Sequence, residues 1–310
     1  MSNSMNSEMQ YGRIRGIEKL VSRVVMGTFG RMTAVSSALF DDFFERGGTC
    51  FDTAHIYGDG GCERVLGGWI TQRDLREEVV ILGKGAREPL STPTDVTWQL
   101  EESLHRLQTD YIDLYMLHRD IPQIPVGELI SLLDEHEKAG RIRAYGASNW
   151  TLPRIQEAQD YAREHGLTGF TAISNQFSLA QMLEPPVEGC VSAWDVDTRD
   201  WLSHTQTPLM PWSSQAGGFF AGQVDPGNIH CWDSSDNSAR LQRATVFGSA
   251  RGLPATTIAL AYVLCQPFPT LPLIGPRTPA ETHTSLLALD VHLTREECEW
   301  LEGQLDDRAL

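Results

Sequence analysis

The chain has 310 residues, of which 41% are apolar and 21% charged, a composition typical of a folded globular protein and not of a disordered one. Its 25 Lys and Arg against 41 Asp and Glu leave a formal net charge of -16, which repels phosphate backbones and anionic lipid surfaces. We therefore expect neither nucleic acid nor membrane as a partner. The longest nearly unbroken apolar run, Ile258–Cys265, is far below the ~20 residues of a membrane-spanning helix. The polar N-terminus does not resemble a secretory signal, so a cytoplasmic protein is expected.

Short apolar, β-branched runs alternate along the chain with longer segments of helical period. The runs that predict strands are Arg23–Met26, Thr49–Asp52, Val79–Lys84, Ile112–His118, Ile142–Ser148, Phe170–Asn175, Leu209–Trp212 and Thr270–Ile274.

Between these strands, local start and stop signals predict helices. The segment Pro93–Leu107 begins with proline at its first position, and Val126–Ala139 carries a continuous apolar face followed by a glycine. Two T-x-x-E sequences, beginning at Thr278 and Thr294, have the capping-box pattern that opens a helix.

Eight strand and helix repeats are what a closed (β/α)8 TIM barrel of the α/β class requires, whereas an open doubly wound sheet more often stops at five or six strands. We expect one barrel domain over residues 20–310, preceded by a disordered or loosely ordered lead-in over residues 1–19. Two segments interrupt the alternation of expected strands and helices, Gln181–Thr207 and Gly217–Asp236. Both follow late strands, so we expect them to be long loops on the C-terminal face, where barrel active sites are built.

Polar residues end three of the expected strands: Asp52, Lys84 and His118, with Tyr57 five residues after the aspartate. Taken singly, each has an ordinary structural reading, such as a turn-forming aspartate or a buried core histidine. Together they predict a catalytic group at the mouth of the barrel. A nearby ammonium favours the phenolate, so Lys84 is expected to lower the pKa of Tyr57 and suit it to proton transfer.

The sequence contains no G-x-G-x-x-G, Walker, H-E-x-x-H or G-x-S-x-G motif, which argues against a Rossmann or P-loop nucleotide site. The segments that it does contain are FDTAHIYGDGGCERVLGGWI, VVILGKGA, LEESLHRLQTDYIDLYMLHRD, GRIRAYGASNW, AISNQFSL, LMPWSSQAGGFFAG and PLIGPRTPAETHTSL. In this order, from about Leu20 to Leu301, they resemble the aldo-keto reductase superfamily. The bacterial and fungal branches, related to the potassium-channel β subunits, look more similar than the mammalian aldose reductase branch.

The resemblance implies a metal-free oxidoreductase that transfers hydride between a nicotinamide cofactor and a small carbonyl or alcohol substrate. The family's catalytic roles carry over onto four residues of this chain. Tyr57 would protonate the carbonyl oxygen, Lys84 would tune that tyrosine while held by Asp52, and His118 would orient and polarise the carbonyl. Aldehydes, ketones and keto sugars all stay candidate substrates, because the late loops that set specificity vary on a common barrel.

The resemblance also implies cofactor-binding positions. Trp212 would stack on the nicotinamide, and Arg277 would bind the adenosine 2′-phosphate, which favours NADP(H) over NAD(H). The family's later acid and Asn positions are His283, Thr284 and Ser285 here, and this departure keeps NAD(H) as an alternative. The other positions are Ser148, Asn149 and Gln176 for the carboxamide, and Ser213, Gln215, Gly217 and Gly218 for the pyrophosphate loop.

Two other functions stay open at this stage. One is a regulatory module resembling the channel β subunits, in which the cofactor site serves as a redox sensor. The other is a metal-dependent barrel hydrolase or isomerase with Asp52, His118 and Asp120 as ligands, which the lysine in the same cluster disfavours. His55, two residues before Tyr57, either lines the substrate mouth or packs within the protein.

Overall fold

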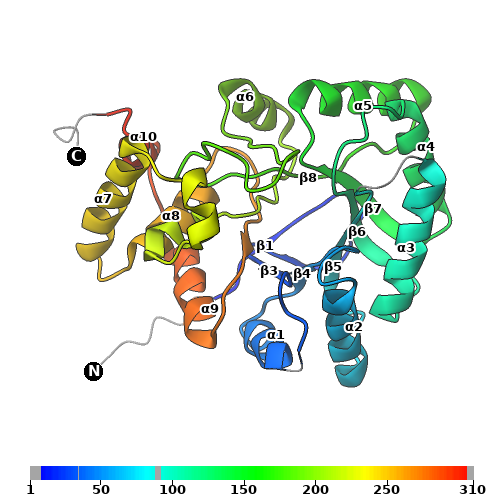
Figure 1. The fold of residues 1–310 in the computed structure, drawn as a ribbon, viewed down its shortest axis with the longest axis horizontal. Coiled ribbons are helices and arrows are strands. Elements are labelled where there is room, and N and C mark those ends of the chain that lie inside the picture. Colours follow the sequence, from blue (N-terminus) through cyan, green and yellow to red (C-terminus); the bar gives the residue numbers. More distant parts are fainter. Residues whose placement is uncertain (1–7, 34, 88–91, 306–310) are drawn as a thin grey trace.

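The structure, a computed structural model, describes residues 8–33, 35–87 and 92–305. Its centre is a parallel sheet with the strand order β8-β7-β6-β5-β4-β3-β9, surrounded by helices (Figure 1). The strands of this sheet are β3 (Val25–Gly27), β4 (Cys50–Asp52), β5 (Val80–Gly85), β6 (Ile112–Leu117), β7 (Ile142–Ser148), β8 (Ile173–Ser174) and β9 (Leu273–Ile274).

Hydrogen bonds around Leu209 close the sheet into a ring. Leu209 forms parallel bridges with Ile173 on one side and Thr270 on the other, and β9 pairs with β3. The expected (β/α)8 barrel is therefore confirmed, although its seventh strand is reduced to this single bridged position. Pro208 and Pro211 explain the reduction, because proline has no N–H to donate to a neighbouring strand.

Helices follow most of the barrel strands and cover their outer face (Figure 1). Their bounds are α1 (Val35–Glu45), α2 (Gly61–Arg73), α3 (Pro93–Leu107), α4 (Val126–Lys138), α5 (Leu152–His165), α6 (Val196–Thr205), α7 (Ser235–Ser249), α8 (Ala255–Leu264), α9 (Pro279–Leu286) and α10 (Arg295–Glu302). Short 3-10 helices are η1 (Ala216–Ala221), η2 (Pro226–Cys231) and η3 (Leu287–Asp290). In the described part of the chain, no helix is both long and apolar enough to span a bilayer.

The helix starts follow their capping residues. At α10, Thr294 accepts from the backbone N–H of Glu297 while the Glu297 carboxylate accepts from the Thr294 N–H, which confirms the expected capping box. At α9 the box is only half formed. Thr278 accepts from the N–H of Glu281, but the Glu281 side chain accepts from the N–H of Arg277 at 2.6 Å instead.

The two segments expected to be loops contain regular structure. Most of the second half of 181–207 is the helix α6, which begins where the Asp195 side chain accepts from the N–H of Thr198. Segment 217–236 includes most of η1 and all of η2. These segments are rich in Gly, Pro and Asp, which led to the expectation of loops. The same residues also serve as helix caps, so this composition is equally compatible with short helices.

Alternating side chains divide the core into a barrel interior and an outer layer. On β5, Ile81 packs in the outer layer against the helices, whereas Val80 and Leu82 belong to the interior cluster. A strand turns successive side chains to opposite faces, so the next interior position on β5 is Lys84. The barrel interior is thus apolar toward the N-terminal ends of its strands and polar at their C-terminal ends.

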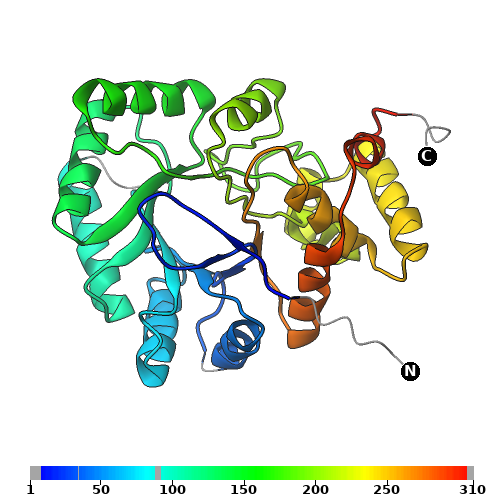
Figure 2. The same cartoon turned by 180° about the vertical axis from the view of Figure 1, so that it is seen from behind.

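Residues 8–19, expected to be a loose lead-in, are an ordered part of the fold. Strand β1 (Tyr11–Gly12) pairs antiparallel with β2 (Val21–Ser22), and Ile14 between them is only 2% exposed. Ile14 joins the interior cluster, where it closes the N-terminal end of the barrel. In Figure 2 this blue segment crosses in front of the strands. The polar composition of the first residues hid this role, because only Met9 and Ile14 among residues 8–19 are buried apolar side chains.

Candidate active site

Three neighbouring strands bring polar side chains to one end of the barrel interior. Asp52 ends β4, Lys84 lies near the end of β5, and His118 directly follows β6. Pairing of Asp52 with Leu82 and of Lys84 with Met116 keeps these positions adjacent. Lys84 donates to the Asp52 carboxylate, and the two residues are 2% and 3% exposed. The three residues therefore lie together, as expected from the ends of the strands.

Tyr57 reaches the same place from the loop between β4 and α2. Its ring centroid lies 5.7 Å from that of His118 with the planes at 79°, and 5.6 Å from the Lys84 Nζ. Phe29, an exposed side chain, also packs edge-on with the Tyr57 ring, at 5.1 Å between centroids. The phenol is therefore surrounded by the lysine, the histidine and an exposed aromatic ring.

The loop that carries Tyr57 is held by Arg106 of α3, which the sequence analysis missed. Its guanidinium donates to the His55 carbonyl at 3.0 Å, to Glu63 at 3.2 Å and to Glu102 at 2.8 Å. The side chain of His55 contacts Glu102 at 2.6 Å and so faces α3 and not the substrate mouth. The available signal in the sequence was the pair of opposite charges, Glu63 in the first turn of α2 and Arg106 on α3.

Burial shifts the pKa values of the three titratable groups in this cluster. Burial lowers the pKa of Lys84 to about 7. Burial, with the nearby Lys84, Arg119 and Arg87 cations, holds the pKa of His118 well below 6.5, so its imidazole is neutral. Burial raises the pKa of Tyr57 to about 12, against an opposing effect of Arg119 and Arg87. The expectation that Lys84 lowers the pKa of this tyrosine is therefore wrong, because loss of hydration outweighs the cations.

A second group of expected residues lies on β7 and the following strands, beside the tetrad of Asp52, Tyr57, Lys84 and His118. The Asn149 side chain accepts from the Trp212 indole N–H at 3.1 Å and donates to Ser148 Oγ at 2.9 Å. It also donates to the His118 carbonyl at 3.3 Å, which links this group to the tetrad. Asn149 has a left-handed backbone with φ of 59°, a conformation that asparagine tolerates better than most residues. Gln176, fully buried, binds Ser192 at 2.8 Å and Ser178 at 3.0 Å.

A glycine turn follows Trp212. Gly217 and Gly218 have φ of 58° and 93°, values that favour glycine. A Cβ on Gly218 would lie 2.9 Å from the Gln223 carbonyl oxygen, whereas one on Gly217 would meet only an indole nitrogen at 3.5 Å. Ser213 also has a positive φ, 48°. The N–H groups of Ala216 and Gly218 donate within this turn, to the carbonyls of Ser213 at 2.8 Å and of Gln215 at 3.2 Å.

Two further positions expected to bind the cofactor lie beside α9, Gln215 near its last turn and Arg277 just before its start. The Gln215 side chain donates to Thr256 at 3.1 Å and to Ser285 at 3.3 Å, so it joins the glycine turn to α8 and α9. The Arg277 guanidinium is 64% exposed, lies 3.6 Å from Glu281 and contacts Gln223. It is thus well placed to meet an anion together with the start of the helix.

Both carboxylates of the hypothetical metal site already have cationic partners. Asp52 pairs with Lys84, and Asp120 accepts from Arg154 at 3.2 Å. Burial raises the pKa of Asp120 against the effect of this arginine. A metal ion would have to displace both ion pairs, which disfavours the metal-dependent alternative.

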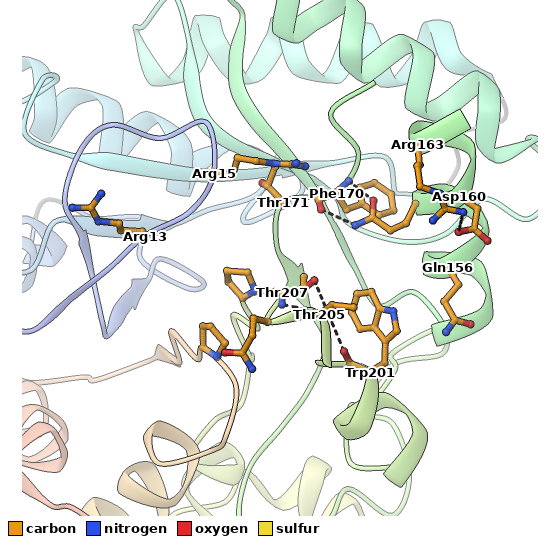
Figure 3. Close-up of a pocket in the computed structure, with 14 residues that line it drawn as sticks. Arg13, Arg15, Gln156, Asp160, Arg163, Phe170, Thr171, Trp201, Thr205 and Thr207 are labelled. Carbon is orange, nitrogen blue, oxygen red and sulfur yellow. Dashed lines mark hydrogen bonds and ion pairs between the residues drawn. The ribbon is translucent and has the colours of Figure 1, made fainter. Parts of the chain in front are cut away.

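A cavity of about 690 Å³ lies at the opposite end of the barrel. Thr171 and Thr207, which precede barrel strands, line it with Arg13, Arg15 and Trp201 (Figure 3). It is therefore separate from the tetrad, which occupies the C-terminal ends of the strands.

Comparison with known proteins gives a consistent result. The sequence profile of the Aldo/keto reductase family matches residues 27–305. The uncharacterized oxidoreductase YrpG of Bacillus subtilis is 28% identical over 314 residues, which cover 93% of each chain. Norsolorinic acid reductase stcV of Emericella nidulans is 29% identical over 300 residues, 90% of this chain and 74% of that protein.

Solved structures share the barrel. A crystal structure of an aldo-keto reductase from Klebsiella pneumoniae in complex with NADPH superimposes with a TM-score of 0.73 and 24% identity. The match covers 96% of this chain and 95% of that one.

Proposed function

Because this chain belongs to the aldo/keto reductase family, whose bacterial and fungal members it resembles, we propose that it is an NADPH-dependent oxidoreductase that interconverts a carbonyl compound and its alcohol. The observation that carries the proposal is the convergence of Lys84, Tyr57 and His118 at the C-terminal end of the barrel. These groups together can donate a proton and stabilise a developing alkoxide.

In the direction of reduction, Tyr57 donates its phenolic proton to the carbonyl oxygen. Its raised pKa keeps the hydroxyl protonated at neutral pH, which is the form that an acid needs. The neutral imidazole of His118 has one N–H to offer to the same oxygen. The Lys84 ammonium, fixed by Asp52, adds positive charge where negative charge develops, and it requires no reorganisation during the reaction.

The chain's residues fit a dinucleotide beside this group. When bound, the nicotinamide supplies the hydride. Trp212 offers a ring for stacking. Ser148, Asn149 and Gln176 carry polar groups suited to the carboxamide, which would compete with the present partners of all three side chains.

The glycine turn supports a place for the pyrophosphate beside Gly217, where an added Cβ would make only an ordinary van der Waals contact at 3.5 Å. Arg277 supports a preference for the 2′-phosphate of NADPH, because an exposed guanidinium forms charge-assisted hydrogen bonds with phosphate. The NADPH in the Klebsiella pneumoniae structure agrees with this choice.

Loss of NADPH absorbance with a panel of aldehydes, ketones and keto sugars tests the proposal, with NADH measured in parallel. We expect turnover of at least one carbonyl and a lower KM for NADPH than for NADH. Quenching of tryptophan fluorescence by NADPH without turnover of any carbonyl would contradict the enzyme and favour a regulatory module. Absence of both signals would contradict the cofactor site as well.

A further inference from the structure

Two arginines lie side by side at the mouth of the candidate active site. Arg119 directly follows His118, and its backbone N–H donates to the Ala86 carbonyl at 3.3 Å. Arg87 is the next residue after Ala86, so the continuing pairing of the strand ends brings the two arginines together. Both therefore lie at the same end of β5 and β6 as Lys84 and His118.

The guanidinium of Arg119 is held in place by neutral partners. It donates to the His118 carbonyl at 3.1 Å and to the Cys190 sulfur at 3.0 Å, the latter from the segment between β8 and α6. A guanidinium has five N–H donors in a planar fork. Most of these donors stay available to a ligand, on a side chain that is already fixed.

The described part of the chain does not compensate the charge of these arginines. Among the residues that the structure describes, neither has a carboxylate within ion-pair distance, and the adjacent Asp120 is paired with Arg154 at 3.2 Å. Burial lowers the pKa of Arg119; Cys190 opposes this shift, and Arg87 adds to it. A partly buried cation without a counter-ion costs free energy, which a bound anion would recover. Such a pair stands out in a chain of net charge -16.

We propose that the carbonyl substrate carries a carboxylate, which Arg119 binds with the help of Arg87 while Tyr57 protonates the carbonyl. This inference rests on the proposed function and specifies its substrate class as aldehyde or keto acids. Phe29, exposed and edge-on to Tyr57, offers an apolar surface for the body of the substrate. Arginine suits the task because its fork matches the two oxygens of a carboxylate.

A matched pair of substrates tests the proposal. We would measure kcat/KM for 4-carboxybenzaldehyde and for its methyl ester, which differs by the loss of the charge. The acid-to-ester ratio should fall about 10- to 100-fold in Arg119→Gln, as expected for loss of a charge-assisted pair. Arg119→Lys should lose less, because it keeps the charge. Arg163→Gln is the control, since Arg163 lies at the opposite end of the barrel (Figure 3), and its ratio should equal that of the wild type.

An unchanged acid-to-ester ratio in Arg119→Gln would overturn the proposal, whether or not kcat/KM falls equally for both substrates. A second readout needs no turnover: binding of terephthalate to the NADPH-loaded protein, followed by tryptophan fluorescence. The affinity for terephthalate should fall about 10- to 100-fold in Arg119→Gln. Equal affinity of this variant and the wild type would overturn the proposal. Reduction of both substrates with an acid-to-ester ratio that Arg119→Gln leaves unchanged refutes this inference alone, whereas carboxylate binding without reduction of any carbonyl refutes the proposed function alone.

Discussion

Replacing Lys84 with methionine tests the buried ion pair at the centre of the site. Methionine keeps an apolar stem of similar length but removes the ammonium, so Asp52, 3% exposed, would become a buried carboxylate without its cation. Leaving one partner of a buried pair uncompensated costs about 3–5 kcal/mol. Protonation of the aspartate limits that cost: with a reference pKa of about 3.9, an aspartate takes up a proton for about 4 kcal/mol at pH 7 and about 1.5 kcal/mol at pH 5.

We therefore expect Lys84→Met to lower the free energy of unfolding by up to about 4 kcal/mol at pH 7 and by about 1.5 kcal/mol at pH 5. The sign follows because the folded variant binds a proton that the unfolded chain releases, so the folded state loses stability as the pH rises. Urea unfolding followed by tryptophan fluorescence measures both values.

The matched control is the double variant Asp52→Asn/Lys84→Met, which removes both charges. It should regain most of the lost stability and show no such change between pH 5 and 7, since replacing both partners of a buried pair is often nearly neutral. A loss below about 1 kcal/mol in Lys84→Met, or an equal loss at the two pH values, would refute the reasoning.

Three other predictions concern separate parts of the site. Because burial raises the pKa of Tyr57 to about 12, carbonyl reduction should show no fall of kcat from ionisation of this phenol up to about pH 10; a fall near about pH 8 that Tyr57→Phe removes would contradict this. Arg277→Gln should raise the KM for NADPH about tenfold and that for NADH less than about twofold, and equal rises in steady-state assays would argue against a role in 2′-phosphate binding. Arg106→Met should lower the free energy of unfolding in urea by about 3 kcal/mol, because Glu63 is left buried without its cation; a loss below about 1 kcal/mol would count against this clamp.

The strands of the barrel and the tetrad could be read from the sequence because both depend on local patterns. Buried parallel strands are short apolar runs. A polar residue that ends such a run on the interior face points into the mouth of the barrel. Lys84 and His118 are such residues. Helix α3 begins at Pro93 and ends at Leu107, as expected, because Thr92 and Asp95 form its cap locally.

Features that depend on distant partners could not be read in this way. The seventh strand shrinks to Leu209 because two prolines remove donors, a loss that matters only once the neighbouring strands are in place. Ile14 becomes part of the barrel interior through contacts far along the chain. The direction of the Tyr57 pKa shift depends on how much water the folded site excludes, and the sequence shows only which charges are near.

The most direct test of the central claim is the comparison of Tyr57→Phe with the wild type on any carbonyl that the enzyme reduces. In Tyr57→Phe we expect kcat/KM to fall about 100- to 10,000-fold, while NADPH binding, measured by tryptophan fluorescence, changes less than about twofold. Tyr161→Phe, which removes a hydroxyl on α5 far along the chain from the tetrad, should behave as the wild type. Wild-type turnover by Tyr57→Phe would contradict the role of Tyr57 as proton donor, because this variant has no phenolic hydroxyl.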